Sequence, residues 1–425
     1  MARATSGSGG DRLSPKAVRT LRAVIACLSL GVSAAAGADP AEARAEVRAL
    51  WVVRTSIVSE AAIEKLVADA KAAGVNTLIV QVRGRGDAFY RSRFEPRSAD
   101  LKDQPESFDP LAVVLQRAHR AGIKVHAWLN THLLADVNEL PADSGHVYNK
   151  RPDWLGVPRK AASELFTLDP KDARYRERIV EVSRENMGEL EGLYTCPANP
   201  AVQKHLANVF LDVLDNYDVD GIHFDYVRYP NPDFSYSRTA LDRFRAAVEP
   251  GLSKEERRQT AALAPSRPLV YIELYPQAWD RFRRQQITNL VERIAAAVRA
   301  KKPRVLVTAA VFANDEDAFN RRFQDWKTWL EKGLLDAVCP MAYTTDTEIW
   351  KRQISIARGS SFGRQVWAGI GAYRQSPEST LEKIRIGRGM GVDGIVLFSY
   401  GHVVTATEWA PAGDYLETIA RQAFR

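Results

Sequence analysis

The stretch that decides the fold covers residues 220–230 and reads Asp220-Gly221-Ile222-His223-Phe224-Asp225-Tyr226-Val227-Arg228-Tyr229-Pro230. Its opening Asp-Gly is a turn signal, the next residues suit a short buried strand, and the closing proline stops regular structure. Asp225 therefore stands at the end of the predicted strand. Barrel enzymes present a catalytic acid in this way, and Tyr226 and Arg228 are suitable neighbours for one. The simpler alternative is an Asp that caps the next helix or pairs with Arg228.

Similar apolar runs recur along the chain, and nearly every one is followed by a helical pattern. The predicted strands are residues 47–53, 77–82, 123–129, 221–226, 304–312, 335–343, 365–373 and 394–400. Short continuous apolar runs are typical of buried parallel strands, whose crossovers carry helices. Eight β–α units predict a (β/α)8 TIM barrel. An open doubly wound sheet is disfavoured, because Val53-Arg54-Thr55-Ser56 stands where its glycine-rich phosphate turn would be.

Three long segments, residues 84–107, 131–198 and 231–275, follow predicted strands. Loops of this length inside a compact domain are usually functional. Because they follow strand ends, we expect them to rise around the active face of the barrel. Loops of this length would form the walls of a deep groove, which suits an extended polymer as substrate.

The first 38 residues have the pattern of an export signal. Basic residues up to Arg22 precede an apolar run at 23–36 that is too short to span a bilayer, and Ala36-Gly37-Ala38 offers a cleavage site. Residues 39–46 then form a linker and 47–425 a single domain. The prediction is a periplasmic or extracellular protein with no stable membrane insertion after signal cleavage; an uncleaved anchor is the alternative.

Composition narrows the class of partner. The 425 residues are 45% hydrophobic and 26% charged, as in ordinary globular proteins. The net charge of +7 implies mild attraction to polyanions. The sequence has no block of Lys and Arg with interleaved aromatic residues, so we do not expect it to bind nucleic acid. Cys196, Cys339 and dispersed histidines lack zinc spacing, so we expect no metal and no cofactor. Cys339 lies in an apolar run, which favours a buried thiol over a disulfide to Cys196.

Hydrogen-bonding and aromatic side chains stand at the predicted strand ends, where barrel enzymes gather their functional groups. The predicted substrate-binding residues are Trp51, Arg54, Gln81, Arg83, His126, Trp128, Asn130, His223, Tyr226, Arg228, Asn314, Tyr343, Tyr373 and Tyr400. Aromatic faces stack on sugar rings and polar groups bind hydroxyls, so the set favours a carbohydrate. The simpler interpretation of some members is that they plug the barrel mouth.

Five motifs, in order, resemble the glycosyl-hydrolase-like family 10 of exported bacterial TIM-barrel proteins. They are Arg48-Ala49-Leu50-Trp51-Val52, Gln81-Val82-Arg83-Gly84-Arg85-Gly86-Asp87-Ala88, His126-Ala127-Trp128-Leu129-Asn130, residues 217–226, and Phe398-Ser399-Tyr400. The resemblance covers about residues 46–420 and implies a glycosidase; one family member acts on peptidoglycan glycan strands stripped of peptides. Two segments depart from the pattern. Residues 225–230 stand where the usual family pattern has a run with two successive Asp residues. Residues 309–314 stand where that pattern has a Ser-Pro-Phe segment.

Glycoside hydrolysis requires two carboxyl groups. Asp225 is the predicted first member, a nucleophile or base held ionised by Arg228 or His223. Asp346, after the sixth strand, is the predicted second member. Glu273, Asp315 and Glu316 remain alternatives, and any of the loop aspartates could instead cap a helix.

We therefore predict a secreted glycoside hydrolase acting on a bacterial cell-wall or extracellular polysaccharide, with peptide-free peptidoglycan glycan strands as the expected substrate. A catalytically weak carbohydrate-binding barrel is the alternative if no second carboxylate approaches Asp225. A polysaccharide deacetylase or metal hydrolase is disfavoured, since no His/Asp spacing converges on a metal.

Overall fold

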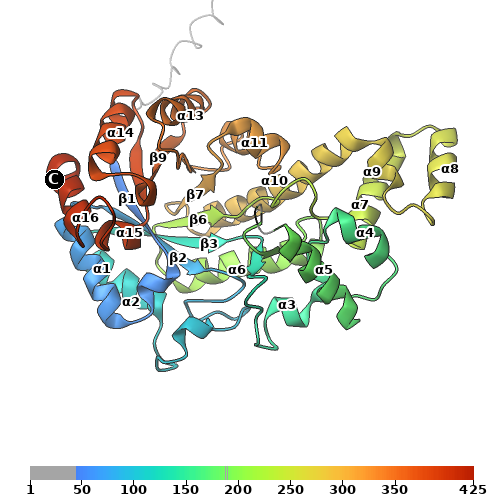
Figure 1. Ribbon diagram of the computed structural model, residues 1–425, viewed down its shortest axis with the longest axis horizontal. Helices are drawn as coiled ribbons and strands as arrows, with labels where there is room; N and C mark the ends of the chain where they lie inside the picture. The colour runs from blue at the N-terminus through green and yellow to red at the C-terminus, as the bar shows by residue number, and fades with distance from the viewer. Residues whose placement is uncertain (1–44, 187, 189) are drawn as a thin grey trace, which may run out of the picture. The chain divides into compact units, whose positions relative to one another are not determined.

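The computed structural model describes residues 45–186, 188 and 190–425, of which Glu46 to Arg425 form one compact unit. Eight parallel strands form its centre, and several of them are labelled in Figure 1. They are β1 (Val47–Val52), β2 (Thr77–Arg83), β3 (Lys124–Asn130), β6 (Gly221–Asp225), β7 (Leu306–Val311), β8 (Ala337–Pro340), β9 (Gln365–Gly371) and β10 (Gly394–Phe398). The hydrogen-bonded order β1-β10-β9-β8-β7-β6-β3-β2 closes on itself. The predicted (β/α)8 TIM barrel is confirmed.

The predicted signal peptide and most of the predicted linker lie outside the described residues. Glu46, the last residue of that linker, is bound to the domain: its carboxylate pairs with Arg388 through two hydrogen bonds of 2.7 Å, and its carbonyl accepts one from Asn76. The folded domain therefore begins at least one residue before the predicted boundary.

Helices return the chain between successive strands and surround the barrel (Figure 1). The main ones are α1 (Glu60–Ala72), α2 (Pro110–Arg120), α6 (Pro200–Asn216), α10 (Pro276–Lys301), α12 (Trp326–Glu331), α13 (Thr347–Gly359), α14 (Pro377–Gly389) and α16 (Asp414–Ile419). Ser59 and Ser376 cap α1 and α14, each accepting a hydrogen bond from a first-turn amide. Within the described range, no helix has the length and apolarity needed to cross a bilayer.

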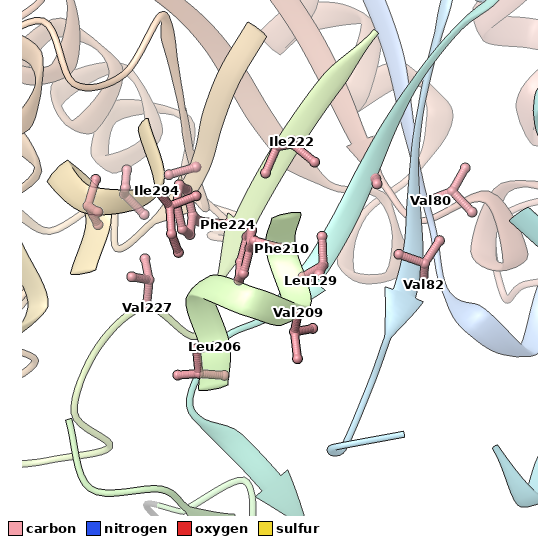
Figure 2. Close-up of a cluster of buried hydrophobic side chains, with 14 of the residues drawn as sticks. Val80, Val82, Leu129, Leu206, Val209, Phe210, Ile222, Phe224, Val227 and Ile294 are labelled. Carbon is pink, nitrogen blue, oxygen red and sulfur yellow. The ribbon is translucent and has the colours of Figure 1, made fainter. Parts of the chain in front are cut away.

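The strands alternate their side chains between two cores. Outward-facing residues pack against the helices, and Figure 2 shows Phe210 of α6 beside Phe224 of β6, with ring centroids 4.7 Å apart. Inward-facing residues form a second cluster inside the barrel, built around Trp51, Trp128 and Trp367. The barrel is therefore filled by large side chains up to its carboxyl-end rim.

Two predicted substrate-binding histidines belong to this interior. The His126 ring occupies space that a Cβ on Gly221 would enter, and burial lowers its pKa to about 4. His223 accepts a hydrogen bond from Trp51 Nε1 (3.3 Å), so its Nδ1–H donates to Thr308 Oγ1 (2.9 Å). Both are neutral, fully enclosed residues that fill the barrel, so the prediction that they bind substrate is wrong.

The two longest predicted loops are folded insertions. Residues 131–198 contain β4 (Leu133–Ala135), α3 (Val147–Lys150), α4 (Arg159–Leu165), α5 (Ala173–Glu185) and β5 (Leu193–Tyr194), and β4 pairs with β5 in an antiparallel sheet. Residues 231–275 contain α7 (Arg238–Val248), α8 (Lys254–Leu263) and α9 (Val270–Leu274). The insertions lie together on one side of the barrel (Figure 1), joined by contacts such as Tyr236 N–H to Val157 O (2.8 Å).

Arg83 is a structural residue and not the predicted sugar ligand. The pairing of β2 with β3 shifts register between Gln81 and Arg83, and Arg83 is fully buried in a paired ion bridge to Glu95, with two bonds of 2.7 Å. His205 of α6 also bonds Glu95 (3.1 Å). Burial alone would raise the pKa of Glu95, but Arg83 and His205 hold it far below its ordinary value.

Replacing Arg83 by Met should destabilise the fold by about 3–5 kcal/mol, because Glu95 would remain buried without its counter-ion. Arg85→Met is the matched control: its side chain is 34% exposed, and loss of its ion pair with Asp136 should cost about 0–1 kcal/mol. Urea unfolding followed by circular dichroism measures both. Equal effects of the two substitutions would contradict the structural role of Arg83.

Candidate functional site

A cavity of about 520 Å³ opens at the carboxyl ends of the barrel strands. Of the predicted site residues, Trp51, Arg54, Gln81, Trp128, Asn130, Asp225, Tyr226, Arg228, Tyr343 and Tyr373 line it. The lining also includes Val53, Arg85, Leu133, Glu191, Ala310, Phe312, Met341 and Phe398. The strand ends therefore converge on one site, as the barrel prediction implies.

The lining divides into two contiguous halves of the barrel. The half formed by β1, β2, β3 and β6, here called the polar wall, contributes the polar residues Arg54, Gln81, Arg85, Asn130, Asp225 and Arg228, together with the rings of Trp51, Trp128 and Tyr226. The half formed by β7 to β10, here called the aromatic wall, contributes Phe312, Met341, Tyr343, Tyr373 and Phe398. Tyr343 stacks on Phe398 with ring centroids 5.3 Å apart, and Tyr373 meets Tyr343 edge-on at 6.1 Å. A cavity lined by both hydrogen-bonding groups and aromatic rings suits a sugar.

Asp225 lies at the end of β6, and only 6% of it is exposed. The next residue, Tyr226, has a φ of 49°, and its backbone N–H donates to Asp225 Oδ1 (2.6 Å). Burial raises the pKa of Asp225 to about 6; the Arg228 charge and the Tyr226 N–H oppose this, and the negative charge of Glu191 adds to it. Arg228 favours the ionised form as predicted, but burial outweighs it, so the pKa lies above its ordinary value; His223 makes no such contribution.

Glu191 is the second carboxyl group of the cavity, and it was not predicted. It precedes β5 in the first insertion and closes a ring of hydrogen bonds. Arg228 donates to Glu191 Oε1 (2.9 Å) and to Tyr194 Oη (2.8 Å), and Tyr194 donates to Glu191 Oε2 (2.7 Å). Burial alone would raise the pKa of Glu191, but Arg228 and Tyr194 outweigh it and lower the pKa. The two carboxyls on this cavity thus have pKa values displaced in opposite directions.

Several predicted site residues do not line the cavity. Asp346 is exposed and caps α13 by accepting from Ile349 N–H (2.9 Å), which is the alternative role considered for it. Asn314 caps α11 (Asp315–Asn320) in the same way. Tyr400 donates to Asp69 (2.8 Å) outside the cavity. Arg83, His126 and His223 are the buried structural residues described above.

The other carboxyls considered also lie away from the cavity. Glu273 bonds Arg267 (2.5 Å) on the second insertion, and Asp315 bonds Lys327 (2.5 Å). Glu316 is an exposed residue in the first turn of α11. Within the described residues, no group of three or more His, Cys, Asp or Glu side chains is arranged to hold a metal ion. Cys196 and Cys339 are buried free thiols.

Comparisons with known proteins support a glycosidase-like barrel. "Glycosyl hydrolase YngK" of Bacillus subtilis (strain 168) is 24% identical over 66% of this chain and 48% of its own length. "Glycosyl hydrolase DigH" of Escherichia coli (strain K12) is 24% identical over 68% of this chain and 59% of its own. The chain thus spans only about half the length of these relatives.

Among solved structures, the catalytic domain of β-amylase from Paenibacillus polymyxa superposes with a TM-score of 0.59 at 13% identity, over 90% of this chain and 98% of that one. This likeness supports the fold alone. The model of the family Glycosyl hydrolase-like 10 matches residues 46–360, which include six of the eight barrel strands and both carboxyls of the cavity. With well over half of its length matched, this chain belongs to the Glycosyl hydrolase-like 10 family.

Proposed function

We propose that the protein is a glycoside hydrolase in which Asp225 is the proton donor and Glu191 its ionised partner. The observation that carries the proposal is the pair of carboxyls on one cavity, one with a raised pKa and one with a lowered pKa. Environments that move two pKa values apart assign the acid and the base of a carboxyl pair. Family membership and the mixture of hydrogen-bonding groups and aromatic rings on the cavity lining support a sugar substrate.

In this mechanism the protonated Asp225 donates to the glycosidic oxygen as the bond to the anomeric carbon breaks. Glu191, kept anionic by Arg228 and Tyr194, stabilises the developing positive charge as nucleophile or as base for a water molecule. The Tyr226 N–H then stabilises the Asp225 anion that remains. This role for Asp225 replaces the predicted nucleophile or base, and Glu191 replaces Asp346.

We extend the proposal to substrate and location: an exported enzyme that cuts peptide-free peptidoglycan glycan strands internally. The export-signal pattern of residues 1–38 supports delivery to the wall. The two insertions, which follow β3 and β6, support a groove for a chain of sugars. The resemblance to the family favours the same substrate.

A catalytically weak carbohydrate-binding barrel is a second candidate, favoured by one observation. Both oxygens of Glu191 already accept hydrogen bonds from Arg228 and Tyr194, as in a purely structural ion pair. Glu191→Gln separates the two functions, because it should abolish hydrolysis and leave glycan binding within a few-fold. A binding protein would show no hydrolysis in either form.

The substrate proposal is tested by incubating the wild type and Asp225→Asn with peptide-free glycan strands and analysing the products by mass spectrometry. We expect the wild type to release oligosaccharides and Asp225→Asn to be slower by a factor of about 10²–10⁴, the usual contribution of a general acid. Release of monosaccharides alone, or cleavage of a neutral glucan with no action on the strands, would overturn the assignment.

Asp225→Asn should also stabilise the fold at neutral pH. The pKa of Asp225 rises from 3.8 to about 6 on folding, so its ionisation destabilises the native state. Stability is unaffected below pH 3.8, falls as the pH rises to about 6, and stays lower above it, by no more than about 3 kcal/mol. The Asn variant should therefore melt above the wild type at pH 7.5 and level with it near pH 3.5. An equal gain at both pH values would exclude this cause.

The pH dependence of kcat/KM distinguishes the two roles of Asp225. As a proton donor it must be protonated, so kcat/KM should fall as the pH rises through about 6. The lowered pKa of Glu191 should place the acidic limb below the ordinary carboxyl range. An activity that increases as the pH rises through 6 would make Asp225 the base, as first predicted.

A further inference from the structure

Two arginines of the polar wall have no part in the proposed chemistry. Arg54 and Arg85 both line the cavity, with side chains 18% and 34% exposed. Arg54 donates to Gln81 Oε1 (3.2 Å), and its carboxylate neighbour Asp100 lies 3.7 Å away with 46% of its side chain exposed. Arg85 pairs with Asp136 at 3.0 Å. Neither Asp100 nor Asp136 is part of the cavity lining, so the lining itself presents the guanidinium groups.

The charge balance of the lining favours an anion at this place. Arg228 is neutralised by Glu191 within the ring they form with Tyr194. Asp225 contributes at most one negative charge, and burial raises its pKa to about 6. Arg54 and Arg85 contribute two positive charges, so the lining carries a net positive charge.

Two glycines allow the observed positions of these arginines, because Gly84 leaves room for the Arg54 side chain and Gly86 permits the turn after Arg85. The Arg54 side chain lies against Gly84, where an added Cβ would be 2.6 Å from Arg54 Cδ. Asn130 Nδ2 fixes the same segment by donating to Gly84 O (2.8 Å). The backbone then turns at Gly86, whose φ is 74°, and this turn brings the Arg85 carbonyl within 2.7 Å of a donating ring nitrogen on His146.

The positions are therefore fixed by close contacts on each side. A side chain on Gly84 would displace Arg54, and a Cβ on Gly86 would lie 2.8 Å from His146 Nε2. Buried Arg83 anchors the start of the same segment through Glu95. Arg85 lies on this segment and Arg54 packs against it, so both should lose less conformational entropy on binding a ligand than arginines on a free loop.

We infer that Arg54 and Arg85 form a subsite for a carboxylate group carried by the sugar chain. This inference rests on the proposed function and narrows it to acidic glycans. Guanidinium groups bind carboxylates through paired, charge-assisted hydrogen bonds, which a neutral amide at the same position cannot match. In a glycan whose peptide was amide-linked to the sugar, removal of the peptide frees this carboxylate. The subsite would therefore favour strands without peptides and disfavour both peptide-bearing strands and neutral polymers.

Binding to the catalytically impaired Asp225→Asn protein tests the inference without interference from hydrolysis. The probes are a peptide-free wall tetrasaccharide with free carboxylates and the same tetrasaccharide with its carboxylates converted to methylamides, measured by isothermal titration calorimetry. We expect the acidic form to bind at least about tenfold tighter at low salt. Adding Arg54→Gln or Arg85→Gln should remove this preference and leave the affinity for the methylamide within about twofold.

Arg91→Gln is the matched control, since this exposed arginine bonds Ser107 O and lies on a different pocket. It should retain the preference for the acidic form, and Arg54→Lys should retain part of it. Equal binding of the two tetrasaccharides by the parent protein would overturn the inference and leave the proposed hydrolase standing. The inference would also be overturned if Arg54→Gln and Arg85→Gln weakened the binding of the acidic tetrasaccharide and of its methylamide equally. Binding of neither would overturn the proposed function as well.

Discussion

Closure of eight parallel strands into a ring is the constraint from which the rest of the structure follows. A closed ring leaves no strand edge unpaired. Neighbouring parallel strands must be joined by a crossover connection, which runs over the outside of the barrel. All strands then end at the same rim, and their inward-facing residues must fill a narrow interior. Trp51, Trp128 and Trp367 fill most of it, and Gly221 provides the room for His126.

This geometry determines the electrostatics of the site. Asn130 and Asp225 are paired in register at the rim of β3 and β6, directly above the filled interior. A carboxyl in that position has packed side chains on one side and the cavity on the other, so its charged form is poorly solvated. The neighbouring buried arginines are neutralised in closed groups, Arg83 by buried Glu95 and Arg228 by the partly exposed Glu191. The raised pKa of Asp225 is thus a consequence of barrel packing that the adjacent ion pairs only moderate.

The sequence was sufficient for the fold, and for the part of the site that depends on strand position. Apolar runs identified all eight strands because buried parallel strands have no polar face, and the end of each run located Trp128, Asn130, Asp225 and Tyr343. It was insufficient wherever depth or loop geometry decided the outcome. His126 and His223 have the same inward orientation as the rim residues but lie deeper in the barrel. Asp346 is a helix cap because the chain turns into α13 immediately after it.

Arg83 and Arg85 show the same limit within one motif. Strand alternation places Arg83 on the same face as Gln81, but the register shift of β2 turns it to Glu95. Arg85, two residues later, lines the cavity. A register shift of this kind arises from the pairing of β2 with β3, and the sequence of β2 alone does not reveal it.

Glu191 could not be predicted because the element that positions it lies outside the barrel repeat. After β3 the chain continues into β4, and the amides of Thr131 and His132 donate to the carbonyls of Asp225 and Tyr226. β4 then pairs with β5, and a Cβ on Gly192 would collide with the Ala135 carbonyl, so the backbones approach closely there. This chain of contacts runs from the Asp225 backbone to the residue that follows Glu191. The barrel supplies one carboxyl of the site, and a two-stranded sheet attached to the same strand ends fixes the other, so the proposed chemistry requires both to fold together.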